Sequence, residues 1–165
     1  MSAVDEFSGF EVIRAAMEVE KNGHRFYSTM STRAKDPLIR ELFTWLAQDE
    51  VGHLNTLEKL APKYSDGSFW ADEEFFLPYL QRFSESEIFP SAERLEEVLK
   101  EEGADLKALD LAIEAEEKFA DYFEAAAQNA VHPDGKEAFS WLAEEEVRHA
   151  QVLRERQAIL APKKG

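Results

Sequence analysis

The chain has 165 residues, a length typical of one domain, and a hydrophobic content of 44% is enough for a sizeable core. A formal net charge of -15 argues against nucleic acid and anionic membranes as partners, because both are themselves negatively charged. The sequence has no cysteine, which excludes disulfides, thiolate catalysis and iron sites with cysteine ligands.

The first six residues contain neither the basic region nor the apolar run of a signal peptide. No later stretch approaches the roughly 18 apolar residues that a membrane span requires. We therefore expect a cytoplasmic protein without a membrane partner. Only seven glycines and six prolines are present, which favours an all-helical fold.

Residues 8–61 contain two long helical patterns and are predicted to form a helical hairpin. Ser8 and Glu11 match a capping box at the start of the first helix, while Asp36 and Pro37 match the N-cap and first position of the second. Each helix has a stripe whose members recur at spacings of three and four, as in helices that face a bundle. The stripes are Ile13, Met17, Glu20, His24 and Tyr27, and then Phe43, Leu46, Glu50, His53, Leu57 and Leu60.

Residues 62–104 are predicted to connect this hairpin to a second one. A turn cluster at 64–67 precedes a short helix, which we expect from Ala92 to Glu102, with Gly103 ending it. Aromatic side chains crowd this connector, where they either cap the open side of the bundle or form the interface of an expected homodimer. They are Phe69, Trp70, Phe75, Phe76, Tyr79, Phe83 and Phe89.

Residues 105–161 are predicted to form the second hairpin, so that residues 1–165 make up one domain. Its first helix begins near Asp105, and its second begins at His132 and Pro133. Both helices again have a bundle-facing stripe. The stripes are Leu109, Ile113, Glu116, Ala120, Phe123 and Ala127, and then Phe139, Leu142, Glu146, His149, Leu153 and Leu160.

The two predicted hairpins are an internal repeat. Residues 18–57 overlay 114–153 without a gap after a shift of 96, and thirteen of the forty positions are identical. A connector of about forty residues is long enough to carry the chain back along the bundle. The repeat therefore predicts an antiparallel four-helix bundle of two repeated hairpins, with one long crossover connection.

Six polar side chains interrupt the apolar stripes at matching places in the two halves. The second and fourth helices each contain a Glu-x-x-His pair, which puts a carboxylate and an imidazole one turn apart on one face. A matching glutamate lies in the stripe of each partner helix. One Glu-x-x-His pair alone is a weak signal, but two copies at a fixed offset, each with a matching glutamate, are specific. The six are Glu20, Glu50, His53, Glu116, Glu146 and His149.

Four carboxylates buried together require compensating positive charge, since burying even one unpaired carboxylate costs roughly several kcal/mol. In the first three helices, no lysine or arginine shares these stripes near the glutamates. Two divalent ions balance four negative charges, and two neutral histidines complete the ligand set. Oxygen and imidazole donors suit iron or manganese, with zinc able to compete.

The sequence resembles rubrerythrin-type proteins of the ferritin-like superfamily, without their rubredoxin domain. The resemblance covers nearly the whole chain and implies a ferritin-like bundle with a non-haem di-iron site. It further implies oxidation of the reduced site by hydrogen peroxide or dioxygen, with the four glutamates as terminal and bridging ligands that carry the chemistry. The resemblance rests on residues 16–20, 26–27, 36–37 and 46–53, and on the matching segments of the second half, 112–116 and 142–149.

Two departures from the family pattern affect the expected activity. Typical rubrerythrins append a rubredoxin-like domain with four cysteines, so the resemblance implies an external electron donor for this cysteine-free chain. Peroxidase members also have an extra glutamate three residues after the main ligand of the third helix, and the repeat places Phe119 there. With Glu114 as the main ligand, the extra residue would be Glu117. The repeat and the stripe favour Glu116.

Other polar and aromatic residues near the stripes allow more than one role. His24 is either an additional ligand or a core-edge histidine bonded to a carboxylate. Tyr27 either hydrogen-bonds a bridging carboxylate or only packs, and its repeat match Phe123 favours packing. Trp45 and Trp141 are predicted to be symmetric packing residues.

The leading functional hypothesis is a di-iron oxidoreductase that detoxifies peroxide. The first alternative is a ferroxidase or iron-handling protein. The second is a helical interaction module that a metal stabilises without redox activity.

Overall fold

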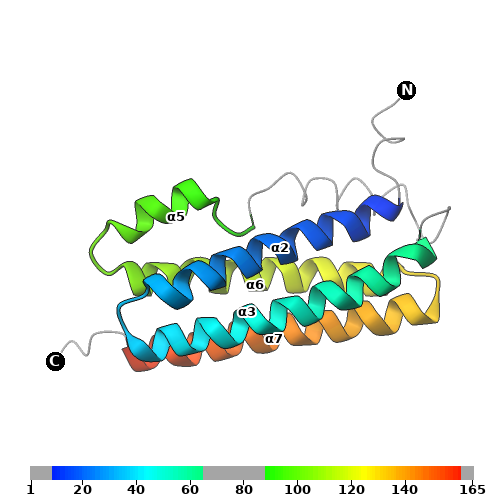
Figure 1. Ribbon diagram of the computed structural model, residues 1–165. Coiled ribbons are helices and arrows are strands. Elements are labelled where there is room, and N and C mark those ends of the chain that lie inside the picture. Colours follow the sequence, from blue (N-terminus) through cyan, green and yellow to red (C-terminus); the bar gives the residue numbers. More distant parts are fainter. Residues whose placement is uncertain (1–8, 65–87, 161–165) are drawn as a thin grey trace.

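The computed structural model describes residues 9–64 and 88–160, and its long helices run side by side (Figure 1). Two helical hairpins, α2–α3 and α6–α7, pack against each other, which confirms the predicted fold class. None of the described helices has the length and apolar character needed to cross a membrane. The elements are α2 (Gly9–Arg33), α3 (Pro37–Leu60), the 3-10 helix η1 (Ala61–Tyr64), α5 (Ala92–Leu99), α6 (Ala104–Asn129) and α7 (Pro133–Leu160).

Carboxylates organise the turn between α2 and α3. Asp36 caps α3 by accepting the N–H of Leu38 at 2.8 Å, and Pro37 occupies the first helical position, as predicted. Asp105, in the first turn of α6, accepts the N–H of Asp36 at 2.8 Å and that of Lys35 at 3.1 Å. The turn therefore joins the two hairpins at this end of the bundle. The predicted capping box of α2 begins at Ser8, which lies outside the described residues.

The short helix α5 ends at Leu99, earlier than the predicted Glu102, and lies beside the ends of α2 and α6 in Figure 1. Gly103 then adopts a φ of 70° immediately before α6, a left-handed conformation that favours glycine. Arg33 at the end of α2 donates two hydrogen bonds to Glu96, at 2.7 and 3.2 Å. This pair attaches α5 to the first hairpin.

The core contains two aromatic groups that the repeat relates to each other. Within each group, neighbouring ring centroids are about 5–6 Å apart. The hydroxyl of Tyr122 donates to the carbonyl of Val12 at 2.7 Å, which joins α6 to α2. The groups are Phe26, Tyr27 and Phe43 in the first hairpin, and Tyr122, Phe123 and Phe139 in the second.

One position breaks the symmetry of this core, because Gly23 is the repeat match of Phe119. Phe119 packs on Phe123 with ring centroids 4.3 Å apart. At Gly23 the corresponding space is filled by Phe89, whose ring would lie 2.8 Å from a Cβ at that position. Among the connector aromatics predicted to cap the bundle or to form a dimer interface, Phe89 is 3% exposed and belongs to the core. The other six lie outside the described residues.

Candidate metal centre

The structure brings together all six predicted ligands inside the bundle. Helices α2, α3, α6 and α7 contribute one carboxylate each, and α3 and α7 add an imidazole one turn later. The exposed fraction is 1% for one histidine and 0% for the other five residues. They are Glu20, Glu50, His53, Glu116, Glu146 and His149.

These side chains form two overlapping groups of four, each able to hold one metal ion. Within a group, each residue offers a ligand atom that lies within 4.8 Å of the others. Glu50 and Glu146 belong to both groups, so their carboxylates are placed to bridge two ions. The first group is Glu20, Glu50, His53 and Glu146, and the second is Glu50, Glu116, Glu146 and His149.

On α6, the carboxylate that enters the cluster is Glu116. The side chain of Glu114 is 65% exposed and pairs with Lys118 at 3.5 Å. The side chain of Glu117 is 48% exposed and pairs with Arg154. Of these three glutamates, Glu116 is the one that lies in the buried cluster, at the position that the repeat register indicates.

Within the described part of the chain, most carboxylate oxygens of the cluster have no hydrogen-bond partner. They include both oxygens of Glu20, Glu50 and Glu146, and one oxygen of Glu116. Leaving such a buried atom unpaired costs roughly 1–3 kcal/mol, and more when it is charged. Burial, assisted by Glu50, raises the pKa of Glu20 well above its ordinary value, and burial with Glu146 raises that of Glu50 to about 7. Bound cations would remove this cost, so the residues fit a dinuclear metal site.

Imidazole groups offset part of the negative charge in the metal-free protein. His149 Nδ1 lies 2.6 Å from Glu116 Oε2, and His53 Nδ1 lies 2.7 Å from Glu146 Oε1. Burial alone would lower the pKa of His149, but Glu116 and Asp49 outweigh it and raise that pKa to about 12. Burial alone would also lower the pKa of His53 and raise that of Glu146. Because these two groups are adjacent, the pKa of His53 is instead raised and that of Glu146 is lowered. Metal ions compete with protons for these Nδ1 atoms.

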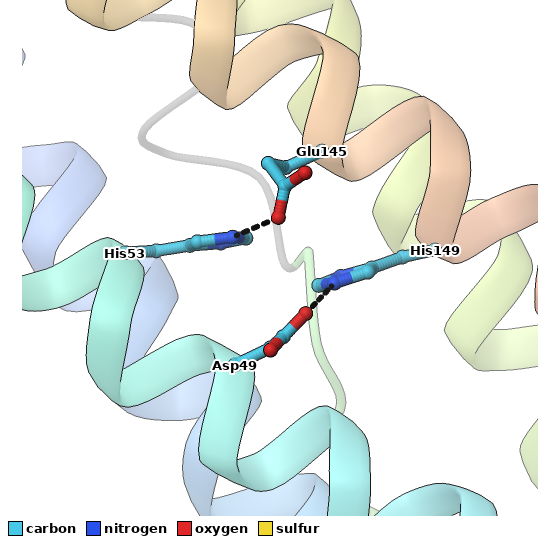
Figure 2. A group of neighbouring side chains, drawn as sticks. All are labelled: Asp49, His53, Glu145 and His149. Carbon is cyan, nitrogen blue, oxygen red and sulfur yellow. Dashed lines mark hydrogen bonds and ion pairs between the residues drawn. The ribbon is translucent and has the colours of Figure 1, made fainter.

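Two acidic residues outside the predicted ligand set, Asp49 and Glu145, each lie at the outer edge of one imidazole. His149 Nε2 donates to Asp49 Oδ2 at 2.9 Å, and His53 Nε2 lies 3.5 Å from Glu145 Oε1 (Figure 2). Such contacts orient a ring and leave its other nitrogen for a metal. A signal for them exists in the sequence, since Asp49 and Glu145 each precede the glutamate of a Glu-x-x-His pair and match at the offset of 96.

Each of the two imidazoles contacts a tryptophan side chain. The ring centroids of Trp45 and His149 are 5.6 Å apart, and those of Trp141 and His53 are 5.5 Å apart. Both contacts are edge-to-face, as the repeat symmetry predicts. The indoles are 40% and 43% exposed, so they lie at the protein surface rather than in the core.

His24 and Tyr27 differ in their relation to the site. His24 is exposed and donates from Nδ1 to the carbonyl of Ala47 at 3.0 Å, so it bonds α3 through a backbone carbonyl rather than through a carboxylate. Tyr27 is fully buried and stacks on Phe43, as predicted for packing. Its hydroxyl has no hydrogen-bond partner among the described residues. Burial, followed by the charge of Glu116, raises its pKa well above the ordinary value.

The fold and the site together define a class, the helical-bundle proteins that hold two metal ions between carboxylates and histidines. Within this class, the chain belongs to the rubrerythrin family, whose sequence model matches residues 11–157. A solved structure of a hypothetical protein from Pyrococcus furiosus matches with a TM-score of 0.69 and 22% identity. The match covers 96% of this chain and 93% of that one, and at this identity it shows a shared fold. No curated protein matches the sequence.

Proposed function

We propose that this protein is a di-iron oxidoreductase whose reduced site is oxidised by hydrogen peroxide or dioxygen. The observation that carries the proposal is the sharing of Glu50 and Glu146 between two ligand groups, because two adjacent ions would use both groups at once. Membership of the rubrerythrin family supports the same assignment.

The donor set favours iron among the candidate metals. It consists of four carboxylates and two imidazoles, and the chain has no thiolate. Four negative charges balance two divalent ions, and this mixture of oxygen and nitrogen donors suits iron or manganese. Zinc competes for the same donors but would support no redox chemistry.

When bound, two iron ions would supply one electron each for reduction of the oxidant. The residues of the chain would hold the two ions, and Glu20 and Glu116 would each serve one ion only, because each belongs to one of the two ligand groups. Asp49 orients the His149 ring through a hydrogen bond, and Glu145 lies 3.5 Å from the outer nitrogen of His53. Tyr27 keeps its proton on Oη at neutral pH, because burial and the nearby carboxylates raise its pKa, so it can donate a hydrogen bond toward the site.

Packed aromatic rings limit the access of water to the carboxylates. Phe89 packs against Tyr27 with ring centroids 5.6 Å apart, beside Gly23. A Cβ at Gly23 would lie 3.3 Å from Glu50 Oε2, which places Phe89 next to a bridging carboxylate. A site that excludes bulk water suits a small oxidant and limits side reactions.

A ferroxidase or iron-handling role is the second candidate, and Phe119 is the observation that favours it. The family resemblance implies an extra glutamate at this place in peroxidase members, whereas Phe119 is a fully buried phenyl ring packed on Phe123. A ferroxidase would turn over excess Fe²⁺ and release Fe³⁺. A peroxidase would instead need electrons from an external donor, since the chain has no cysteine to hold a rubredoxin-type iron.

Protein purified anaerobically under reducing conditions can distinguish these roles. The proposal expects iron in the protein, an oxidised-site absorbance that a reductant bleaches, and faster re-oxidation by peroxide than by air. Equal rates with release of Fe³⁺ from excess Fe²⁺ would favour the ferroxidase. A metal-bound protein without any redox response would contradict both and leave a metal-stabilised interaction module.

A further inference from the structure

A third group of metal-binding side chains lies beside the dinuclear site. Its members each offer a ligand atom within 4.8 Å of the others. Figure 2 shows that they face one another across the space between α3 and α7. We propose that this group, the outer site, is a loading site that captures a divalent transition-metal ion before it reaches the dinuclear centre. The outer site consists of Asp49, His53, Glu145 and His149.

The outer site has the donors and the spacing of a four-coordinate metal site. His149 Nε2 lies 2.9 Å from Asp49 Oδ2, and His53 Nε2 lies 3.5 Å from Glu145 Oε1. The two imidazole rings are stacked with centroids 5.2 Å apart. His53 Nε2 is buried and makes no hydrogen bond to any described residue, although it is aimed into this group. Two imidazole nitrogens and two carboxylates are a ligand set for zinc, cobalt or ferrous iron.

Exposure distinguishes the outer site from the dinuclear centre. Every ligand of the centre is at most 1% exposed, so an ion cannot reach it directly from solvent. In contrast, the side chain of Asp49 is 30% exposed and that of Glu145 is 13% exposed. Of the three groups of metal-binding residues in the described part of the chain, this one has partly exposed members. It therefore joins the protein surface to the two buried imidazoles.

Both imidazoles belong to the outer site and to the centre, so a metal ion would have to leave the outer site before the same ring could bind an ion in the centre. Nδ1 of each ring faces the inner carboxylates, and Nε2 faces the outer ones. A neutral imidazole has one free lone pair, so an ion at Nε2 and an ion at Nδ1 compete for the same ring. An ion that moved to the centre would bind Nδ1 and displace the proton there, and protonation of Nε2 would then leave the outer site empty. A loading site requires this kind of exchange.

A nearby cation weakens the outer site, as a transient site requires. Arg148 donates to the second oxygen of Glu145 at 2.7 Å, and its side chain is 62% exposed. Its guanidinium repels an arriving divalent ion and occupies one carboxylate oxygen. The repeat match of Arg148 is Gly52, so the first hairpin has no equivalent charge there.

Co²⁺ binding to a chain without inner carboxylates tests the outer site directly. In the variant with Glu20, Glu50, Glu116 and Glu146 all changed to Gln, we expect one Co²⁺ per chain with the intense visible absorption of a four-coordinate ion. Adding Asp49→Asn and Glu145→Gln should abolish that absorption, while Arg148→Gly should tighten binding. Circular dichroism checks that each variant is helical. A folded variant that binds no Co²⁺, or binds it equally after the outer substitutions, would overturn the proposal.

Uptake kinetics in the otherwise unchanged chain provide a second test that does not depend on the four-Gln variant. Stopped-flow mixing with Co²⁺ can be followed by quenching of tryptophan emission, because Trp45 and Trp141 contact the imidazoles. We expect Asp49→Asn with Glu145→Gln to slow association by about tenfold or more. Glu41→Gln with Glu144→Gln is the matched control, since it removes the same charge from exposed positions of α3 and α7.

The kinetic outcomes separate the outer site from the dinuclear centre on which it depends. An unchanged association rate with a lower equilibrium affinity would mean that Asp49 and Glu145 only orient the rings, and would overturn the loading site alone. A chain that binds no metal ion at all would overturn the dinuclear centre as well. Slower association without loss of the final two-ion stoichiometry supports both.

Discussion

At the scale of single residues, the centre depends on carboxyl groups whose burial is unfavourable in the absence of bound cations. Glu20, Glu50 and Glu116 all have a raised pKa, and burial is the largest cause for each of them. The metal-free protein therefore holds protons at positions that the ions would occupy. Metal binding is expected to release these protons, which couples affinity to pH.

Glu116 provides the sharpest test of the ligand assignment at this scale. We expect Glu116→Gln to reduce the number of bound Fe²⁺ ions per chain from two to one, because the second ligand group loses its terminal carboxylate. Glu114→Gln is the control, since that side chain is 65% exposed and should leave both ions in place. Isothermal titration calorimetry under anaerobic conditions gives the two stoichiometries. Equal stoichiometry in the two variants would refute the assignment.

The pH dependence of stability without metal follows from the same groups. A group whose pKa is higher in the folded than in the unfolded protein stabilises the fold at a pH below its unfolded-state pKa. This stabilisation is lost as the pH rises through the folded-state pKa. Glu50 sets a window from 4.5 to about 7, and Glu20, Glu116 and His149 act in the same direction. The raised pKa of His53 adds a fifth group that acts in this direction, and the lowered pKa values of Glu146 and Asp49 oppose these five.

We therefore expect the metal-free protein to lose roughly a few kcal/mol of unfolding free energy between about pH 5 and pH 8. Thermal unfolding in the presence of a chelator measures this change. The Glu50→Gln variant should show a shallower slope, because one of the titrating groups is gone. A stability that rises with pH would contradict this prediction, because it would show that the buried carboxyl groups are already ionised in the folded, metal-free protein.

Residues differ in how far the sequence alone could predict their roles. The six residues of the candidate centre could be found from the sequence because each is a polar residue within an apolar stripe. Asp49 and Glu145 lie one place away from the stripe, where an acidic residue is indistinguishable from a solvated one without the position of the opposite hairpin. His24 shares the spacing of the stripe, yet its side chain is exposed and donates to the carbonyl of Ala47. Spacing alone therefore does not separate a residue of the buried cluster from one at the edge of the stripe.

At the scale of elements, helix starts follow local chemistry, whereas the segment before α5 depends on tertiary packing. Asp36 and Pro37 begin α3 at the predicted place, and Gly103 precedes α6 with a positive φ. No local pattern, however, predicts that Phe89 fills the space above Gly23. In the second hairpin the equivalent space is filled by Phe119, the repeat match of Gly23, from its own helix. In the first hairpin it is filled by Phe89, which is distant in the sequence.

Gly23 and Gly52 form a matched pair for testing this packing. Gly23→Ala should destabilise the protein by roughly 1–3 kcal/mol, because the new methyl group would lie 2.8 Å from the Phe89 ring. Gly52→Ala should instead stabilise it by roughly 0.5–1 kcal/mol, since that position in α3 is exposed and has open space around it. Chemical denaturation gives both values. A stabilising Gly23→Ala would mean that Phe89 does not pack there.

At the scale of the whole molecule, the two hairpins pack more closely within themselves than against each other. Polar links between them include Tyr122 to Val12, Asp105 to the α2–α3 turn, and Arg156 to the carbonyl of Leu38. Bound metal ions would add to these links, because each candidate ligand group contains residues from both hairpins. Bound ions should therefore stabilise the assembly of the hairpins rather than either one alone.

Removal of metal should accordingly lower the stability of the entire bundle. A bound ion present at one hundred times its dissociation constant contributes roughly 2.7 kcal/mol. In a protein of this size that corresponds to roughly 5–10 °C in the midpoint of thermal unfolding. Scanning calorimetry with and without a chelator tests the shift, and an unchanged midpoint would show that the ions do not hold the hairpins together.

The most direct test of the dinuclear centre is an anaerobic calorimetric titration of the metal-free protein with Fe²⁺. Glu50 and Glu146 are shared between two complete ligand groups, so two ions should bind per chain, with release of protons from the buried carboxyl groups. A stoichiometry of two with proton release is the predicted result. A stoichiometry of one, or no binding, would contradict it.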